Sequence, residues 1–206
     1  LGLLKKESTF QDNKETSSIE YEYDAWGRPT KLKYNNSNSL TKTLTYDKDG
    51  NLKEATMTGY APVNMDYDIM GRKTKESWLI DGNLYSIGYA YDNVGNVTKI
   101  TYPDGKIIDF NYYPDARNLV RNIPNLIGTA HTDGFIYNDN SLSTEIRYSN
   151  GLNNYKQYDQ RSRLITNIYG TTQGDIDRKE TQYRYYSSGN IKTIIDGYVN
   201  QPLNYS

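Results

Sequence analysis

The strongest constraint on the fold of this chain is a short phrase that recurs along it. The phrase reads Tyr-x-Tyr-Asp-x-x-Gly followed by Arg or Asn, and full copies span residues 21–28 and 89–96. Shorter or degenerate copies keep the same frame at residues 46–51, 67–72, 112–117, 137–141, 158–163 and 185–190. The tyrosine before each turn recurs at steps of 23, 21, 24, 21, 25, 21 and 27 residues. Such a period is typical of a repeat array in which each unit is one supersecondary element.

The chemistry of the phrase predicts one β-hairpin in each copy. Asp caps the first position of a tight turn, and Gly at the fourth position adopts the positive φ that follows. Apolar residues alternate before the turn, as at Ile19, Tyr21 and Tyr23, which is strand periodicity. A second strand then runs to a second turn, predicted at residues 35–38, 81–82, 103–105, 150–151 and 196–197.

Helices are not expected, because Gly, Asn or Pro interrupts the pattern about every ten residues, and a mean helix needs about 11 to 12. The sequence therefore predicts an all-β chain, an antiparallel β-hairpin repeat array that forms a curved or spiralling sheet strip. We expect about eight repeats over residues 19–199, with a flanking segment at 1–18. A tail at 200–206 is expected to continue into missing sequence.

Tyrosine has to supply the apolar area of this array. Leu, Ile, Val and Phe make up 40 of the 206 residues, a fraction typical of disordered chains when net charge is also high. The net charge is only -1, and there are 22 tyrosines, each of which can bury roughly 150–250 Å². Tyrosine suits a thin sheet better than phenylalanine, because its hydroxyl can find a partner or water at the sheet edge.

Composition also excludes several classes of function. A net charge of -1 and an isoelectric point near 5.9 offer no basic footprint for nucleic acid or an anionic membrane. No apolar run approaches the roughly 18 to 20 residues of a membrane span, so no span is expected in this fragment. The absence of cysteine removes disulfides and thiol nucleophiles. Phosphate loops, metalloprotease motifs and dinucleotide fingerprints are absent, so no cofactor is expected.

The residues that could carry catalysis or bind a metal have simpler explanations. The motif aspartates resemble paired catalytic carboxylates, but their role in the turn accounts for them. Asp47 with Asp49, or Asp175 with Asp177, could offer oxygen ligands to calcium, yet neither segment has the spacing of an EF-hand loop. His131 is the single histidine and has no nucleophile motif beside it, which favours a surface loop. We therefore expect no catalytic residue, no metal site and no enzyme.

The two tryptophans differ in position. Trp26 falls in a turn, where an exposed indole could stack on a sugar ring or cover the gap between neighbouring hairpins. Trp78 follows Ser77 in an expected strand, which favours packing. Trp26 is thus the candidate carbohydrate-binding residue.

Taken together, the Tyr-Asp-x-x-Gly-Arg phrase and the Tyr-Pro-Asp-Gly turn at residues 102–105 resemble the YD-repeat or Rhs family over residues 19–199. Some copies depart from the pattern: Tyr113, Asn138 and Tyr186 replace Asp, and Ala116, Ser141 and Ser162 replace Gly. The copy at residues 137–141 also looks one residue shorter before the apolar Leu142. These departures leave the local turn geometry open.

The resemblance implies a scaffold. Rhs toxins, the BC components of insecticidal toxin complexes and teneurins wind such hairpins into a spiralling β-sheet shell, which in the toxins encloses a C-terminal effector. It implies a secreted or cell-surface protein whose partners are other segments of a longer chain, including an enclosed effector. The alternative is an extracellular carbohydrate- or protein-binding module that holds a glycan. The turn and packing roles of the repeated residues favour the scaffold. We expect an open strip whose end strands are covered by missing sequence or by another copy.

Overall fold

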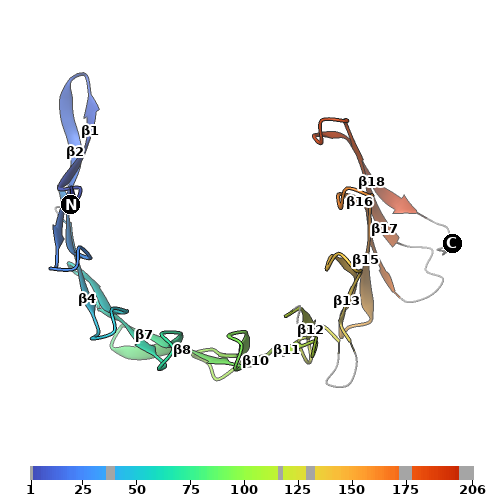
Figure 1. Ribbon diagram of the computed structural model, residues 1–206, viewed down its shortest axis with the longest axis horizontal. Coiled ribbons are helices and arrows are strands. Elements are labelled where there is room, and N and C mark those ends of the chain that lie inside the picture. The colour runs from blue at the N-terminus through green and yellow to red at the C-terminus, as the bar shows by residue number, and fades with distance from the viewer. Residues whose placement is uncertain (1, 36–39, 116–117, 129–132, 172–177, 200–206) are drawn as a thin grey trace. The chain divides into compact units, whose positions relative to one another are not determined.

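The computed structural model describes residues 2–35, 40–115, 118–128, 133–171 and 178–199 (Figure 1). In these residues every regular element is a β-strand, and each strand pair with a defined register is antiparallel. The chain divides into two compact units, Leu1–Ala90 with Lys99–Ile107, and Tyr91–Thr98 with Ile108–Ser206. The expected all-β, antiparallel hairpin array is confirmed.

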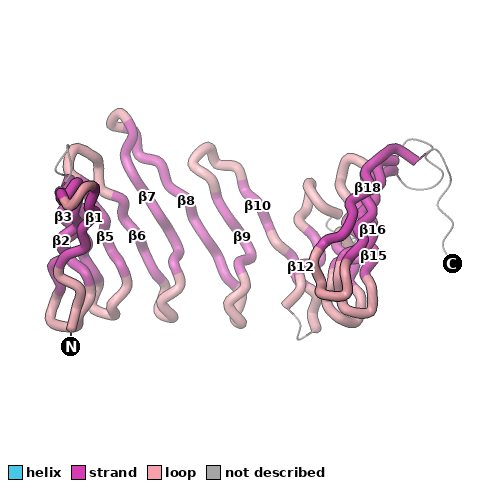
Figure 2. The backbone as a smooth tube through the Cα atoms, turned by 90° about the horizontal axis from the view of Figure 1, so that it is seen from above, coloured by secondary structure: helices cyan, strands magenta, loops and turns pink. Residues whose placement is uncertain are grey.

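The first sheet contains ten strands that follow one another in chain order, so each strand is hydrogen-bonded to its neighbours in sequence. In Figure 2 the tube of β5 to β8 runs as a single layer of adjacent strands with loops at both ends. Its members are β1 (Lys6–Gln11), β2 (Lys14–Tyr23), β3 (Pro29–Asn35), β4 (Leu40–Tyr46), β5 (Leu52–Met57), β6 (Val63–Tyr67), β7 (Lys73–Ile80), β8 (Asn83–Tyr91), β9 (Val97–Thr101) and β10 (Ile107–Asp109).

A short pair and a second large sheet make up the rest of the described chain. The pair consists of β11 (Asn111–Tyr112) and β12 (Val120–Asn122). The second sheet has six strands, again in chain order. They are β13 (Phe135–Tyr137), β14 (Ser143–Arg147), β15 (Leu152–Tyr158), β16 (Leu164–Thr171), β17 (Arg178–Tyr185) and β18 (Ile191–Val199).

The motif turns have the geometry that the sequence predicts. In the first copy the Gly27 N–H donates to the Asp24 carbonyl at 3.0 Å, and Gly27 has a φ of 80°. Ser141 and Ser162 replace this glycine in two later copies and adopt the same left-handed conformation, with φ of 61° and 62°. The pairing shifts by one residue immediately before the motif tyrosine, as between Glu22 and Tyr23, which is the bulge expected beside such a turn.

Two details of the expected turns are wrong. Asp196 and Gly197 lie inside β18, paired with Thr181 and Glu180, because β17 offers a complete partner strand and the Asp196 carboxylate accepts a hydrogen bond from Thr181 at 2.7 Å. The copy at residues 137–141 is not shorter. The Asn138 N–H donates to the Leu142 carbonyl, so Leu142 occupies the place that Arg or Asn takes in other copies.

The copy after Tyr112 differs in length. Tyr112 pairs with Val120, eight residues on, whereas Tyr23 pairs with Pro29, six residues on. Ala116 and residues 36–38 of the predicted second turn lie outside the described residues. The described residues also contain three turns that the sequence did not indicate: at Asp12–Asn13, where both residues have positive φ, after Met57, and after Ile123.

The interior is thin. Ile168 is the one hydrophobic side chain that is buried in the described part of the chain, and the other buried side chains are polar: Ser18, Asn122, Asn153 and Asn154. Most strand residues are half-buried instead. Such an array is stabilised by contacts between adjacent hairpins, because it has little of the central core on which a globular domain relies.

Candidate functional site

The motif aspartate organises each turn through both oxygens of its carboxylate. In the seventh copy Asp159 Oδ1 accepts hydrogen bonds from the backbone N–H groups of Arg161 and Arg163, at 2.9 and 3.0 Å. Its Oδ2 accepts from Arg163 Nε at 2.7 Å. The same three bonds recur at Asp24, Asp47, Asp68 and Asp92, with Arg28, Asn51, Arg72 and Asn96 as side-chain donors.

These bonds explain why Arg or Asn ends the phrase, since either can bond to Oδ2. They also set the charge state of the carboxyl groups. The hydrogen bond from the Arg163 side chain lowers the pKa of Asp159, and that from the Asn51 side chain lowers the pKa of Asp47. The motif aspartates are thus ionised and fully used by the turn, which is a structural role.

The motif tyrosine joins one hairpin to the hairpin before it. The Tyr46 hydroxyl donates to the Pro29 carbonyl at 2.8 Å, and Pro29 is the residue that pairs with Tyr23 of the preceding copy. The same bond, at 2.7–3.0 Å, joins Tyr23 to Leu4, Tyr67 to Leu52, Tyr112 to Val97, Tyr137 to Val120, Tyr158 to Ser143 and Tyr185 to Leu164. We call this bond the tyrosine joint. It confirms the expectation that the tyrosine hydroxyl has a partner, and the partner is the neighbouring hairpin.

A second contact between hairpins runs in the opposite direction. The guanidinium of Arg28 lies over the ring of Tyr46 in the next copy, 4.3 Å from its centroid, and Arg163 lies 4.5 Å from the Tyr185 centroid. Arg28 also limits what the next turn can hold, because a Cβ at Gly50 would lie 3.2 Å from Arg28 Nη1. Both pairs of copies therefore meet through a tyrosine hydroxyl and a cation, and at Arg28 the contact also includes the turn glycine Gly50.

Trp26 lies at the tip of the first motif turn, as expected, and is 80% exposed. Arg28 lies over its ring at 5.0 Å, and both residues line a concavity of about 530 Å³ with Tyr46, Lys48 and Gly50. Trp78 lies in a strand as predicted, and in β7 it pairs with Tyr85.

The remaining candidate residues include three that the structure does not describe. His131, Asp175 and Asp177 lie outside the described residues. Within the described ranges, no group of three or more His, Cys, Asp or Glu side chains is arranged to hold a metal ion.

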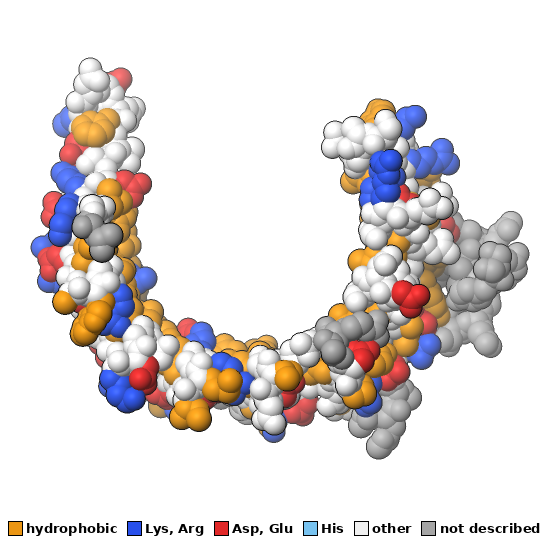
Figure 3. Space-filling view, viewed as in Figure 1, with side chains coloured by type: hydrophobic (Ala, Val, Ile, Leu, Met, Phe, Trp, Pro, Cys, Tyr) orange, Lys and Arg blue, Asp and Glu red, His pale blue; other side chains and the backbone are white. Residues whose placement is uncertain are grey.

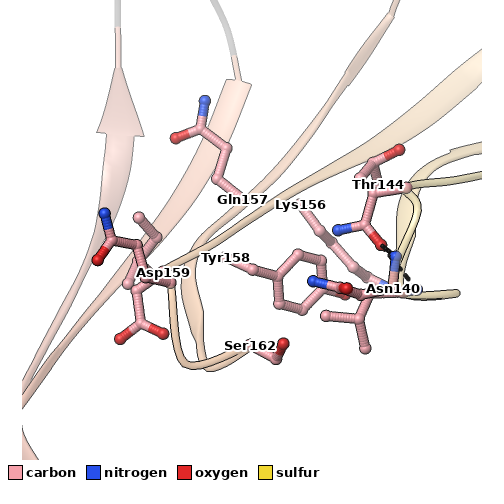
Figure 4. Close-up of a pocket in the computed structure, with 11 residues that line it drawn as sticks. Asn140, Thr144, Lys156, Gln157, Tyr158, Asp159 and Ser162 are labelled. Atoms are coloured by element: carbon pink, nitrogen blue, oxygen red, sulfur yellow. Dashed lines mark hydrogen bonds between the residues drawn. The ribbon is translucent and has the colours of Figure 1, made fainter.

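A pocket that the sequence did not indicate lies between two turns of the six-stranded sheet (Figure 4). Its volume is about 550 Å³, and it is lined by the turn after Tyr137 and by residues around Tyr158. In Figure 4 Lys156 runs beside the Tyr158 ring toward Asn140, with Thr144 and Ser162 on the surrounding wall. The signal that could have found this pocket is Lys156, which interrupts a repeated apolar position.

The surface carries both signs of charge. On the face seen in Figure 3, Lys and Arg side chains are interspersed with Asp and Glu along the described strands. Ion pairs account for part of this mixture, as between Lys33 and Glu22 at 2.9 Å and between Lys179 and Asp196 at 3.2 Å. In the part of the chain that the structure describes, no helix has the length and apolar character to cross a membrane.

Comparison with solved structures places the architecture. The chain superposes on the crystal structure of TcdB2-TccC3-TEV with a TM-score of 0.61 and 14% identity, over 88% of this chain and 11% of that one. The fold is that of a segment of a Tc toxin chain. The structure of the Photorhabdus luminescens Tc holotoxin pore with a TccC3 mutation matches with a TM-score of 0.60 and 13% identity, over 93% of this chain and 12% of that one. The crystal structure of TcdB2-TccC3 without its hypervariable C-terminal region matches with a TM-score of 0.59 and 13% identity, over 88% of this chain and 11% of that one.

No protein-family model and no curated protein matches the sequence. The likeness to the toxin structures therefore shows the fold alone, and this chain spans about an eighth or less of each matched toxin chain.

Proposed function

We propose that this chain is a YD/Rhs-repeat segment of a longer, secreted or cell-surface protein, in which it forms part of a shell that encloses or displays another domain. The observation that carries the proposal is the tyrosine joint, which recurs in seven copies at 2.7–3.0 Å and in six of them links a hairpin to the preceding copy. Because such a contact needs only the adjacent copy, the same contact can be repeated as copies are added, and a long sheet that forms part of a shell can be built in this way.

The Tc toxin fold supports the same reading, because the matched segments belong to much larger chains. On this proposal the partners are other segments of the same polypeptide, including an enclosed effector domain. The proposal assigns no catalytic activity, and the use of both carboxylate oxygens of Asp24, Asp47 and Asp159 by their own turns supports that assignment.

Limited proteolysis of the longest natural polypeptide that carries this sequence tests the proposal. We expect the array to resist cleavage and, if it encloses a domain, to protect that domain as well. Opening two joints with Tyr46→Ala and Tyr158→Ala should expose the enclosed domain, whereas a displayed domain would be cleaved at the same rate in both proteins. An array that is cleaved as fast as unstructured linkers would contradict the structural role.

A second candidate function is carbohydrate binding at Trp26, which the 80% exposure of its ring favours. The indole face that Arg28 does not cover is available to stack on a sugar ring. A glycan array probed with the chain and with Trp26→Ala tests this function, and Trp78→Ala is the control. Binding that is lost only with Trp26 would support it, and equal binding by all three proteins would contradict it.

A further inference from the structure

One position of the repeat carries a lysine where every other copy is apolar. The residue two places before the motif tyrosine lies on the same strand face as that tyrosine. In the copy at residues 158–163 this residue is Lys156. In the other copies it is Tyr21, Leu44, Met65, Tyr89, Phe110, Phe135 or Tyr183. Packing between hairpins accounts for the apolar residues but not for an ammonium group, so Lys156 calls for a local explanation.

Lys156 lies in β15, half-buried, and lines the pocket of about 550 Å³ shown in Figure 4. Among the described residues its ammonium forms no hydrogen bond or ion pair, and burial lowers its pKa. The one carboxylate on the pocket wall, Asp159, is already paired with Arg163 at 2.6 Å. The pocket therefore holds one positive charge that no group in the described chain compensates.

The rest of the wall suits an anion with one charge. Asn140 and Ser162 contribute an amide and a hydroxyl group that can donate hydrogen bonds, while the Thr144 hydroxyl already donates to the Ile136 carbonyl at 3.2 Å. The Tyr158 ring and Leu142 contribute apolar area. A single ammonium balances a carboxylate, while a phosphate dianion would keep an uncompensated charge in a partly buried site.

We propose that this pocket binds a monovalent carboxylate group, held by Lys156 and surrounded by Asn140, Thr144 and Ser162. A sugar acid and an acidic side chain of a polypeptide both offer this group. The proposal depends on the local geometry of two turns and is independent of whether the array encloses another domain.

Titration of the ¹⁵N-labelled chain with sodium acetate, against sodium chloride at equal ionic strength, tests the proposal by amide chemical shifts. We expect saturable shifts confined to residues 138–144 and 156–162. Lys156→Met should weaken acetate binding by at least about tenfold, because a charge-assisted hydrogen bond is lost. Lys156→Arg should keep most of the affinity, and Lys75→Met, which changes an exposed lysine of the first sheet, should keep all of it.

Shifts that match those in sodium chloride, or that persist unchanged in Lys156→Met, would overturn the proposal. Tighter binding of inorganic phosphate than of acetate would also overturn it. Titrations with glucuronate and with the α-amide of N-acetylglutamate distinguish the two sources of the carboxylate, because the compound that binds more tightly identifies the ligand class. If Lys156→Met does not fold, the acetate titration of the unaltered chain and of Lys156→Arg still decides.

Discussion

The ten-stranded sheet and the six-stranded sheet use the same hairpin with different turn residues. The four motif turns of the first sheet, which follow Tyr23, Tyr46, Tyr67 and Tyr91, all carry both Asp and Gly. Each motif turn of the second sheet departs from the pattern, with Asn138 and Ser141, with Ser162, or with Tyr186. The fourth residue of the turn nevertheless donates its N–H to the carbonyl of the first residue in the motif turns of both sheets, at 2.9–3.2 Å.

The difference teaches that the turn residues affect the stability of the hairpin and do not determine whether it forms. What the two sheets share is the tyrosine joint at the end of the strand, as at Tyr46 and Tyr158. Strand pairing and the joint hold the backbone in the turn, and an L-residue then accepts a left-handed conformation at some cost.

The sheets also differ in what they bury. In the described residues of the second sheet Asn153, Asn154 and Ile168 are buried, and Asn154 Nδ2 donates to Asn167 Oδ1 at 2.6 Å and to the Ile168 carbonyl at 3.2 Å. Ser18 is the buried side chain of the first sheet in the same residues. Polar contacts between strands thus replace part of an apolar core in the second sheet.

Removing a whole motif ring should have the largest effect on either sheet. Tyr46→Ala and Tyr158→Ala lose the joint and the aromatic packing, and we expect each to lower the free energy of unfolding by about 3 kcal/mol. Urea denaturation followed by circular dichroism measures the change. Tyr60→Ala, at a residue that is 67% exposed, is the control and should change little. Equal effects at Tyr60 and Tyr158 would show that the joint is not special.

Removing only the hydroxyl should have a smaller effect that is the same in both sheets. Tyr46→Phe and Tyr158→Phe leave the carbonyls of Pro29 and Ser143 without their tyrosine donor, and we expect a loss of about 1 kcal/mol in each. The same denaturation measurement checks it, with Tyr60→Phe as control. A loss in one sheet only would break the claim that the joint is their common element.

Exchanging the turn residues should shift the two sheets in opposite directions. Ser162→Gly relieves a left-handed serine and should stabilise the chain by about 1 kcal/mol. Gly50→Ser should destabilise it by a similar or larger amount, because φ is 93° and the new Cβ meets Arg28. Thermal unfolding of the two variants checks this. A Ser162→Gly variant no more stable than the parent would mean that Ser162 is not strained.

Acid should weaken the turns that carry the motif aspartate more than the turn that carries Asn138. The backbone N–H of Arg72 lowers the pKa of Asp68, and the Asn51 side chain lowers that of Asp47, each below the ordinary value of 3.8. A carboxyl group with a lowered pKa contributes stability above its unfolded pKa and loses it as pH falls through the folded pKa. Hydrogen exchange at pH 3 and pH 6 should therefore show a greater loss of protection around residues 47–51 and 68–72 than around 138–142, where Asn138 does not titrate. Equal losses would contradict this assignment.

Much of the fold was predictable because the information is local. The spacing of Tyr23, Tyr46 and Tyr67 predicts hairpins, and Asp-x-x-Gly predicts their turns. The Asp196–Gly197 turn failed because the same dipeptide can continue a strand when a partner strand runs past it, as β17 does. The sequence of one hairpin does not show how far its neighbour extends.

The candidate site was less predictable. Trp26 was identified by its turn position, and its exposure is as expected. Lys156 was missed, although it interrupts an apolar position that is visible on aligning the copies. Its importance comes from the pocket between two turns about 20 residues apart, and no pattern within one repeat describes a space between repeats.

The sequence by itself determined that this chain is an array of antiparallel hairpins, because turn chemistry and alternation act within a few residues. Only the tertiary structure decided where the tyrosine hydroxyls bind, which turns tolerate serine, and that Lys156 lies unpaired in a pocket. The reason is physical. A hydrogen bond to the next hairpin and the burial of a charge depend on groups that are distant in the chain, and strand register alone brings those groups together.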